Sequence, residues 1–290
     1  MTPLDYEFLR RLLKERSGLD LSTDKQYLVE SRLLPLARRV GLGTITELVV
    51  KMKSGAEQLT SDVVQAMTTN ETFFFRDKIP FDHLRDPILP TLVQSRAMRH
   101  SIRIWSAACS TGQEPYSIAM CLREFGPMLS GWRTEIVATD LSQDVLEKAR
   151  AGLYSQFEVQ RGLPIQLLVK HFSQTGEMWQ LNADIRSMVQ HRQLNLLQDF
   201  SHLGKFDVIF CRNVLIYFDQ ETKISIFERL ARMLEPDGYL MLGAAESVVG
   251  ITDAFRPCSD RRGLYQLNPA RMARPGGAAT LAGLKVAAAR

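Results

Sequence analysis

Hydrophobic residues in the first 67 positions recur with the spacing of amphipathic helices. One face of the first such segment carries Tyr6, Leu9, Leu12 and Leu13. The pattern predicts helices over Leu4–Arg16 (ending near Gly18), Lys25–Val40 (bent at Pro35), Thr44–Lys53 and Ala56–Met67. We therefore expect residues 1–67 to form a separate all-helical domain.

From residue 81 onward the pattern becomes an alternation of helices and buried strands. Helices are predicted over Phe81–Met98, Leu141–Ala151 (with Ser142 as its cap) and Ser225–Leu234. Strands are predicted over Ile102–Ser106, Thr134–Asp140, Gln193–Leu197, Asp207–Cys211, Tyr239–Gly243 and Gly263–Leu267, with a turn at residues 236–238. This alternation favours a doubly wound α/β sheet, which binds ligands at the carboxyl ends of its strands.

Two further segments depart from that alternation. Between Gly152 and His191 lie the short runs Leu167–Phe172, Met178–Leu181 and Ile185–Val189, which predict a small antiparallel insertion. After Asn268 the chain contains many alanines and glycines and no acid, which favours a disordered tail. The expected organisation is a helical domain (1–67), a linker (68–80), an α/β domain (81–268, insertion at about 152–191) and a tail (269–290).

The stretch from Ile102 to Met120 gives the clearest ligand signal. A buried strand leads into a loop of small residues that ends at Gly112, and Glu114 lies in the first turn of the next helix. The loop lacks the GxGxxG pattern, and Glu114 would repel a pyrophosphate. A neutral or cationic ligand is favoured, and S-adenosylmethionine (SAM) fits that description. A βαβ unit without a ligand is the alternative.

Polar residues at other strand ends point to the same edge of the sheet. Asp140 ends the second strand, where doubly wound folds hold ribose hydroxyls. Arg212 and Asn213 follow the continuous apolar run DVIFC, and Tyr217 would share a helical face with Asn213 if that segment coils. In the motif NETFFFRD, three consecutive phenylalanines must pack in different directions, as at a junction. Arg76 beside them indicates a carboxylate or ligand nearby, or else an ordinary interdomain seam.

Composition narrows the classes of protein to which the chain can belong. A net charge of +4 is too small to indicate nucleic acid, and the four cysteines show no CxxC and no metal-ligand spacing. No signal peptide or long apolar run is present, so a cytoplasmic protein without membrane insertion is expected. The second predicted helix carries Lys25, Arg32, Arg38 and Arg39 against Glu30 alone. This is either a solvated face or a docking surface for an acidic partner.

The motifs NETFFFRD, WSAACSTGQEPYS, ATDLS, NLL and FDVIFCRNVLIYF, in that order, resemble those of the chemotaxis receptor methyltransferases, the CheR family. The resemblance covers about residues 1–268. It implies a small all-helical domain joined to a SAM-binding α/β domain with a β-insertion. The implied activity is transfer of a methyl group from SAM to glutamate side chains on the cytoplasmic helices of transmembrane chemoreceptors. The product would be S-adenosylhomocysteine (SAH), and no metal is implied.

The same resemblance assigns site residues one by one. For the cofactor it implies Asn70, Thr72 and Arg76 of the first motif, the acids Glu114 and Asp140, Asn195 and Leu196 beside the adenine, and Arg212 with Asn213. Arg76 and Tyr217 are candidates for steering the incoming carboxylate, and Arg32, Arg38 and Arg39 are candidates for receptor docking. Gln113 departs from the Glu of many relatives, with little expected effect. A glutamate is already ionised at neutral pH, so the reaction needs no general base.

Other functions remain possible at this point. A methyltransferase acting on RNA or a small molecule is one, although the mild charge and scattered aromatics do not supply a nucleic-acid groove. A SAM-binding sensor or scaffold without turnover is the other. We also expect a monomer. The short connection between Phe172 and Met178 predicts that the insertion does not bind a C-terminal receptor pentapeptide, because little of its edge strand is free.

Overall fold

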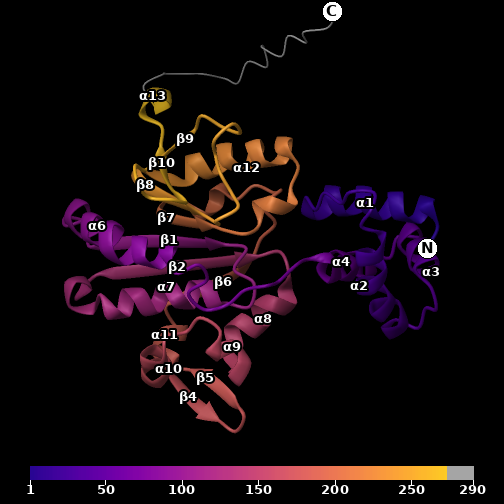
Figure 1. Cartoon of the computed structure of the whole chain (residues 1–290), viewed down its shortest axis with the longest axis horizontal. Helices are drawn as coiled ribbons and strands as arrows, with labels where there is room; N and C mark the ends of the chain where they lie inside the picture. The colour runs from indigo at the N-terminus through magenta and orange to yellow at the C-terminus, as the bar shows by residue number, and fades with distance from the viewer. Residues whose placement is uncertain (273–290) are drawn as a thin grey trace, which may run out of the picture.

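The computed structural model describes residues 1–272 and shows a helical lobe beside a larger α/β lobe (Figure 1). Of the predicted tail, residues 273–290 lie outside the described residues, and Pro269–Met272 forms a short helix, α13, that the sequence did not predict. None of the helices in the described part combines the length and hydropathy needed to cross a membrane.

The N-terminal bundle consists of the first four helices, which lie close to the predicted ranges. Their bounds are α1 (Pro3–Ser17), α2 (Gln26–Arg39), α3 (Ile45–Lys53) and α4 (Glu57–Met67). Thr2 and Asp5 form a capping box at the start of α1, and Gly18 ends it with φ of 77°. The four apolar faces enclose a core of their own, built around side chains such as Leu9, Leu33, Leu48 and Val63.

A seven-stranded sheet forms the centre of the α/β lobe. Its order is β6 (Val189–Gln193), β2 (Arg133–Asp140), β1 (Ser101–Ala107), β7 (Phe206–Cys211), β8 (Leu234–Leu242), β10 (Leu264–Leu267) and β9 (Phe255–Pro257). The first five strands are parallel, and β10 runs antiparallel to both of its neighbours. All six residues of β7 are buried, as expected for a central parallel strand covered on both faces.

Helices cover both faces of this sheet, so the predicted doubly wound fold is confirmed. One face packs against α5 (Ile79–His83), η1 (Leu84–Ile88), α6 (Leu89–Ser95), α7 (Gln113–Glu124) and α8 (Gln143–Ala151). The other packs against η3 (Ser201–Leu203), η4 (Leu215–Tyr217) and α12 (Gln220–Met233). A short 3-10 turn, η2 (Gly126–Leu129), follows α7. The single helix predicted over Phe81–Met98 is instead interrupted by the π-helical turn η1, which contains Pro87.

The insertion is present, but its strands are not all the predicted ones. A three-stranded antiparallel sheet has the order β3 (Leu153–Ser155), β5 (Met178–Leu181), β4 (Phe172–Thr175), and α9 (Gln156–Gln160) follows β3. The run Leu167–Phe172 is mostly helical (α10, Ile165–His171), and Ile185–Val189 divides between α11 (Ala183–Arg186) and β6. Short apolar runs do not distinguish buried helical turns from strands, and both predictions were wrong for that reason. Ser173 and Gln174 are exposed on the edge strand β4. That the insertion does not bind a C-terminal receptor pentapeptide stays a prediction.

Two strand boundaries also differ from prediction. The strand predicted at Gln193–Leu197 lies earlier, at Val189–Gln193, so Asn195 and Leu196 follow the strand instead of ending it. Residues 236–238, predicted as a turn, are instead part of β8. The register of β8 against β7 shifts beside them, between Phe206 and Val208. An irregularity of this kind accommodates Pro and Gly without ending the strand.

The three phenylalanines of NETFFFRD do pack in different directions at a junction. Phe74 is fully buried and meets the rings of Tyr154 and Phe172 in the insertion edge-on, at centroid distances of 5.0 and 5.6 Å. Phe75 packs on Phe81, while Phe73 is half-buried beneath the guanidinium groups of Arg76 and Arg161. At the same junction a Cβ on Gly162 would lie 2.1 Å from the Phe74 carbonyl oxygen, so only glycine fits there.

Candidate functional site

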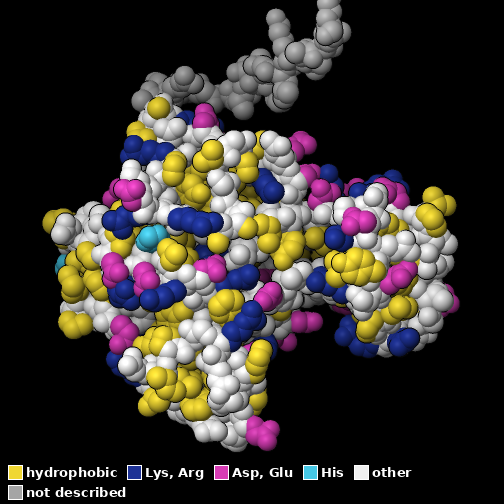
Figure 2. All heavy atoms as spheres, viewed as in Figure 1, with side chains coloured by type: hydrophobic (Ala, Val, Ile, Leu, Met, Phe, Trp, Pro, Cys, Tyr) yellow, Lys and Arg dark blue, Asp and Glu magenta, His cyan; other side chains and the backbone are white. Residues whose placement is uncertain are grey.

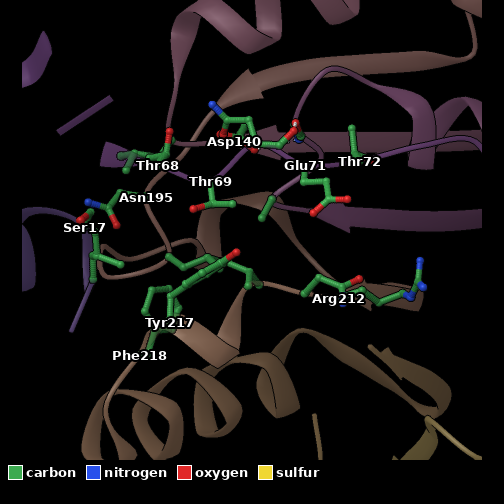
Figure 3. Close-up of a pocket in the computed structure, with 18 of the residues that line it drawn as sticks. Ser17, Thr68, Thr69, Glu71, Thr72, Asp140, Asn195, Arg212, Tyr217 and Phe218 are labelled. Atoms are coloured by element: carbon green, nitrogen blue, oxygen red, sulfur yellow. Dashed lines mark hydrogen bonds between the residues drawn. The ribbon is translucent and has the colours of Figure 1, made fainter. Parts of the chain in front are cut away.

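A cavity lies between the N-terminal bundle and the carboxyl ends of β1, β2 and β7, and we call it the strand-end pocket (Figure 3). It brings together every residue that the sequence assigned to cofactor or carboxylate binding: Asn70, Thr72, Arg76, Glu114, Asp140, Asn195, Leu196, Arg212, Asn213 and Tyr217. The carboxyl edge of a parallel sheet is where such folds bind ligands. What each side chain does there stays a prediction.

Asp140 ends β2 and lies buried in the wall of the pocket. Its Oδ2 accepts the Ser110 N–H at 2.8 Å, and its Oδ1 accepts the Ser142 N–H at 3.0 Å. Burial raises the pKa of Asp140 above the ordinary aspartate value, and these backbone bonds partly offset the effect. Each carboxylate oxygen retains a lone pair, so the group can still accept hydrogen bonds from a ligand's hydroxyls.

Ser142 precedes α8 as predicted, but its side chain does not cap that helix. The cap comes from the N-terminal bundle: Gln65 of α4 accepts the Gln143 N–H and the Ser142 hydroxyl with Oε1, each at 3.1 Å. The helix that follows Asp140 is therefore held by a side chain from the other lobe. This correction has a physical cause, because a tertiary partner has replaced the local cap.

Arg212 is a buried residue of the pocket lining that binds several neighbouring groups. Its guanidinium donates to Glu114 Oε2 at 2.9 Å, to Asp77 Oδ2 at 2.8 Å and to the Arg76 carbonyl at 2.9 Å. Glu114 also accepts the Ser106 hydroxyl at 2.8 Å. The Arg212 side chain is 1% exposed, and its Nε has no hydrogen-bond partner among the described residues. Arg212 therefore connects the linker to the start of α7, and its predicted contact with the cofactor stays a prediction.

Arg76 is half-buried at one side of the pocket, with its guanidinium close to the Phe73 ring. Its Nη1 donates to the Glu71 carbonyl at 2.8 Å. The Glu71 carboxylate is bound by Arg161, which holds the pKa of Glu71 below its usual value. Arg76 forms no ion pair within residues 1–272, so its charge is available to a ligand or a substrate carboxylate.

The predicted helical relation of Asn213 to Tyr217 is wrong. Asn213 has φ of 58°, and only Leu215–Tyr217 coils, as the 3-10 turn η4. Both residues still line the pocket, and Figure 3 shows Tyr217 extending into it from the side opposite Asp140. The Tyr217 carbonyl accepts the Asp20 N–H at 2.9 Å, so a backbone bond ties this wall to the bundle.

Asn195 also links the two lobes. Its Nδ2 donates to the Arg16 carbonyl at 2.7 Å, and its Oδ1 accepts the Leu197 N–H at 2.9 Å. The amide thus has protein partners on both sides, and its predicted contact with an adenine stays a prediction. Leu196 lies beside it and supplies an apolar surface of the pocket.

Sequence reasoning missed the part of the pocket that the N-terminal bundle and the linker supply: Ser17, Leu19, Met67, Thr68, Thr69 and Glu71. Ser17 and Leu19 lie at the end of α1, and Met67 ends α4. No motif marks these positions, because the pattern of a bundle shows its own core and not the face against another lobe. Glu71 was the exception, since it sits within NETFFFRD beside residues that were identified.

Of the three arginines assigned to docking, two are free on the surface. Arg38 and Arg39 are exposed, and neither forms an ion pair with a described residue. Arg32 instead donates to the Met67 and Thr68 carbonyls and to the Thr69 hydroxyl, so its guanidinium holds the linker. Figure 2 shows Lys and Arg side chains gathered along the lower edge of the helical lobe, below the α2 label of Figure 1.

Comparison with known proteins agrees with this architecture. Residues 4–68 match the model described as "CheR methyltransferase, all-alpha domain", and residues 70–264 match "CheR methyltransferase, SAM binding domain". "Chemotaxis protein methyltransferase 1" of Pseudomonas aeruginosa is 44% identical over 87% of this chain and 93% of its own length. "Chemotaxis protein methyltransferase Cher2" of Pseudomonas putida is 42% identical over 87% of this chain and 94% of its own. The chain belongs to the CheR methyltransferase family, and its SAM-binding domain supplies most of the residues that line the strand-end pocket.

Proposed function

We propose that this protein transfers a methyl group from SAM to glutamate side chains of chemoreceptors and that the strand-end pocket holds SAM. The single observation that carries the proposal is the convergence in one cavity of the linker motif, Asp140 and the loop after β7. We also propose the boundaries 1–67, 68–80 and 81–268, which the end of α4 at Met67 supports.

The residues of the pocket fit SAM group by group. Asp140 offers acceptors for ribose hydroxyls. Arg212 pairs with Glu114 and Arg161 with Glu71, yet the three acids that line the pocket outnumber its two arginines, a balance that suits a ligand bearing an ammonium and a sulfonium. Leu19, Leu194, Leu196 and Phe218 provide apolar surface for an adenine ring. We assign Asn70, Thr72, Asn195 and Asn213 to the remaining polar contacts.

SAM supplies an activated methyl group: a glutamate oxygen bonds to the methyl carbon as the carbon–sulfur bond breaks, the electron pair stays on sulfur, and a glutamyl methyl ester and SAH result. The protein's own contribution is alignment and exclusion of water, because the attacking carboxylate is already ionised. Arg76 and Tyr217 lie where they can orient the incoming carboxylate. Too strong a contact from Arg76 would stabilise the substrate carboxylate and slow its attack on the methyl group. We therefore propose that Arg76 orients this carboxylate as it enters the pocket.

We propose that the cytoplasmic helices of chemoreceptors dock on α2. Exposed positive charge at Arg38 and Arg39 supports this, because complementary charge speeds and orients encounter. Arg32 supports docking indirectly, by holding the linker between α2 and the pocket. A cytoplasmic location follows from such a substrate, and the monomeric state stays a prediction that sedimentation can test.

The activity is tested with radiolabelled SAM and bacterial membranes that either contain or lack chemoreceptors. We expect label in the receptor band that mild alkali releases as methanol, since a carboxyl methyl ester hydrolyses and a methylated amine does not. Label on RNA or on small molecules would point to a different substrate. SAH binding without transfer to any fraction would point to a sensor or scaffold and refute the proposed function.

Docking is tested by reversing two charges at a time. The double variant Arg38→Glu with Arg39→Glu should slow receptor methylation and weaken its dependence on salt, while leaving SAH affinity unchanged. Lys51→Glu with Lys53→Glu, on α3 of the same bundle, makes the same change in charge and is the matched control. Equal rates and salt dependence for both double variants would mean that α2 is only a solvated face.

A further inference from the structure

The side chain of Glu246 lies beneath the loop that follows β7. Its Oε2 accepts the N–H groups of Asn213 and Gly243, each at 2.8 Å. Its Oε1 accepts those of Val214 at 3.0 Å and Leu215 at 2.8 Å. The residue is 8% exposed, so one buried carboxylate binds four main-chain donors. Neither the sequence motifs nor the proposed mechanism gives Glu246 a role.

The loop has a conformation that needs such a partner. Asn213 is left-handed, with φ of 58°, and the successive N–H groups of residues 213–215 converge on the carboxylate. Consecutive amides arranged in this way form an anion-binding nest, and here the anion is part of the protein. A left-handed residue other than glycine persists where the surroundings hold it.

The end of β8 is shaped to admit this contact. A Cβ on Gly243 would lie 2.7 Å from Glu246 Oε2 and 2.8 Å from Asn213 Nδ2. Any side chain at position 243 would therefore push the carboxylate and the loop apart. The absence of one lets two neighbouring strand ends meet, with the Asn213 side chain against Gly243 as a contact additional to the four hydrogen bonds.

The loop so held forms one wall of the strand-end pocket through Arg212, Asn213, Val214 and Tyr217. We propose that Glu246 is a positioning residue for methyl transfer: it fixes this loop so that Asn213 and Tyr217 face the reacting groups. It acts only through the main chain and lines no part of the pocket itself. The proposal rests on the proposed function, because the reaction defines which groups the loop must face.

The test is Glu246→Gln, which keeps the shape but sets an amide N–H₂ against main-chain donors. We expect kcat for receptor methylation to fall at least about tenfold, with SAH affinity and receptor KM changed by less than about threefold. Of the residues assigned to the cofactor, only Asn213 belongs to this loop, and the contacts on the Asp140 side are untouched, which is why SAH affinity should fall far less than kcat. Hydrogen exchange at the amides of residues 213–215 should accelerate in the same variant.

Glu228→Gln is the matched control. That carboxylate on α12 binds the Thr252 hydroxyl and Arg271, so its loss perturbs stability without touching the loop. It should leave kcat and exchange at residues 213–215 unchanged. Glu246→Asp, which keeps two acceptor oxygens on a shorter arm, should restore part of the lost kcat, and it carries the kinetic test if Glu246→Gln does not fold.

The proposal is overturned if kcat in the position-246 variants falls only in proportion to the fraction unfolded, as in the control. It is equally overturned if the amides of residues 213–215 exchange freely in the wild type. A wild type that methylates no receptor refutes the proposed function instead. In that case hydrogen exchange at the amides of residues 213–215 still shows whether Glu246 holds the loop.

Discussion

The two edges of the large sheet are both rich in charge, yet they use it differently. At the amino edge, Asp207 is fully buried and accepts from Arg96, Arg99 and the Arg103 N–H, each at 2.7 Å, and Arg96 also pairs with Asp237. At the carboxyl edge Glu114 is likewise paired with Arg212, but within residues 1–272 the only donors to Asp140 are main-chain N–H groups. Charge alone therefore does not mark a site. Unused hydrogen-bonding capacity on a buried group does.

The largest effect is expected from breaking the amino edge. Asp207→Ala would leave buried Arg96 with Asp237 as its one acidic partner among the described residues and would orphan the Arg103 N–H. Removing one partner of a buried charge network costs about 3–5 kcal/mol of unfolding free energy. Urea denaturation measures this loss. SAH affinity of the folded protein should not change, and a loss below about 1 kcal/mol would show that the network is dispensable.

The next largest effect is expected at the carboxyl edge. Asp140→Ala removes charged hydrogen bonds worth about 1.5–3 kcal/mol, so SAM and SAH should bind at least about tenfold more weakly, each with a stoichiometry of one. Titration calorimetry measures both. Asp144→Ala, an exposed acid on the helix that follows, is the control and should bind normally. Unchanged affinity in a folded Asp140→Ala protein would falsify the assignment of this site.

A smaller effect on SAH affinity and on stability is expected when the pH is lowered. Because burial raises the pKa of Asp140, SAH affinity should begin to fall on acidification at a higher pH than an ordinary aspartate would give. The free energy of unfolding depends on pH in the opposite direction. The folded state favours protonated Asp140, so the contribution of Asp140 to this free energy falls as pH rises from the ordinary aspartate pKa through the raised one. Both dependences should disappear in Asp140→Asn, and their persistence there would assign them to other groups.

The smallest effect is expected from the exposed partner at the amino edge. Asp237 holds Arg96 with both oxygens, but its side chain is 51% exposed. Asp237→Asn should therefore cost less than about 1 kcal/mol, because solvent screens the pair and Arg96 keeps Asp207. A loss in urea denaturation as large as that of Asp207→Ala would remove the distinction between buried and exposed members of the network.

Sequence reasoning located the carboxyl edge because its signals are local. Gly112 and Glu114 stand next to a strand whose hydrophobic run is unmistakable, and Asp140 ends another. The amino edge was not foreseen. Asp207 and Arg96 are 111 residues apart, and neither belongs to a motif that would associate them.

The errors have the same origin. Ser142 looked like a helix cap, but the cap comes from Gln65, 77 residues earlier. The spacing of Asn213 and Tyr217 suggested one helix face, but the carboxylate of Glu246 holds Asn213 in a left-handed conformation that breaks the helix. In both cases a tertiary contact decided a local structure, and spacing along the chain carries no information about such contacts.

The bond from Gln65 to the start of α8 also limits how freely the two lobes could be exchanged. A chimera that receives a foreign segment for residues 1–67 loses a helix cap beside Asp140 unless the donor supplies an amide at the same place. It also receives a new wall for the pocket, since Ser17, Leu19 and Met67 travel with the bundle. The bundle, on which we propose that receptors dock, therefore cannot be grafted as a self-contained module. Any graft carries part of the strand-end pocket with it.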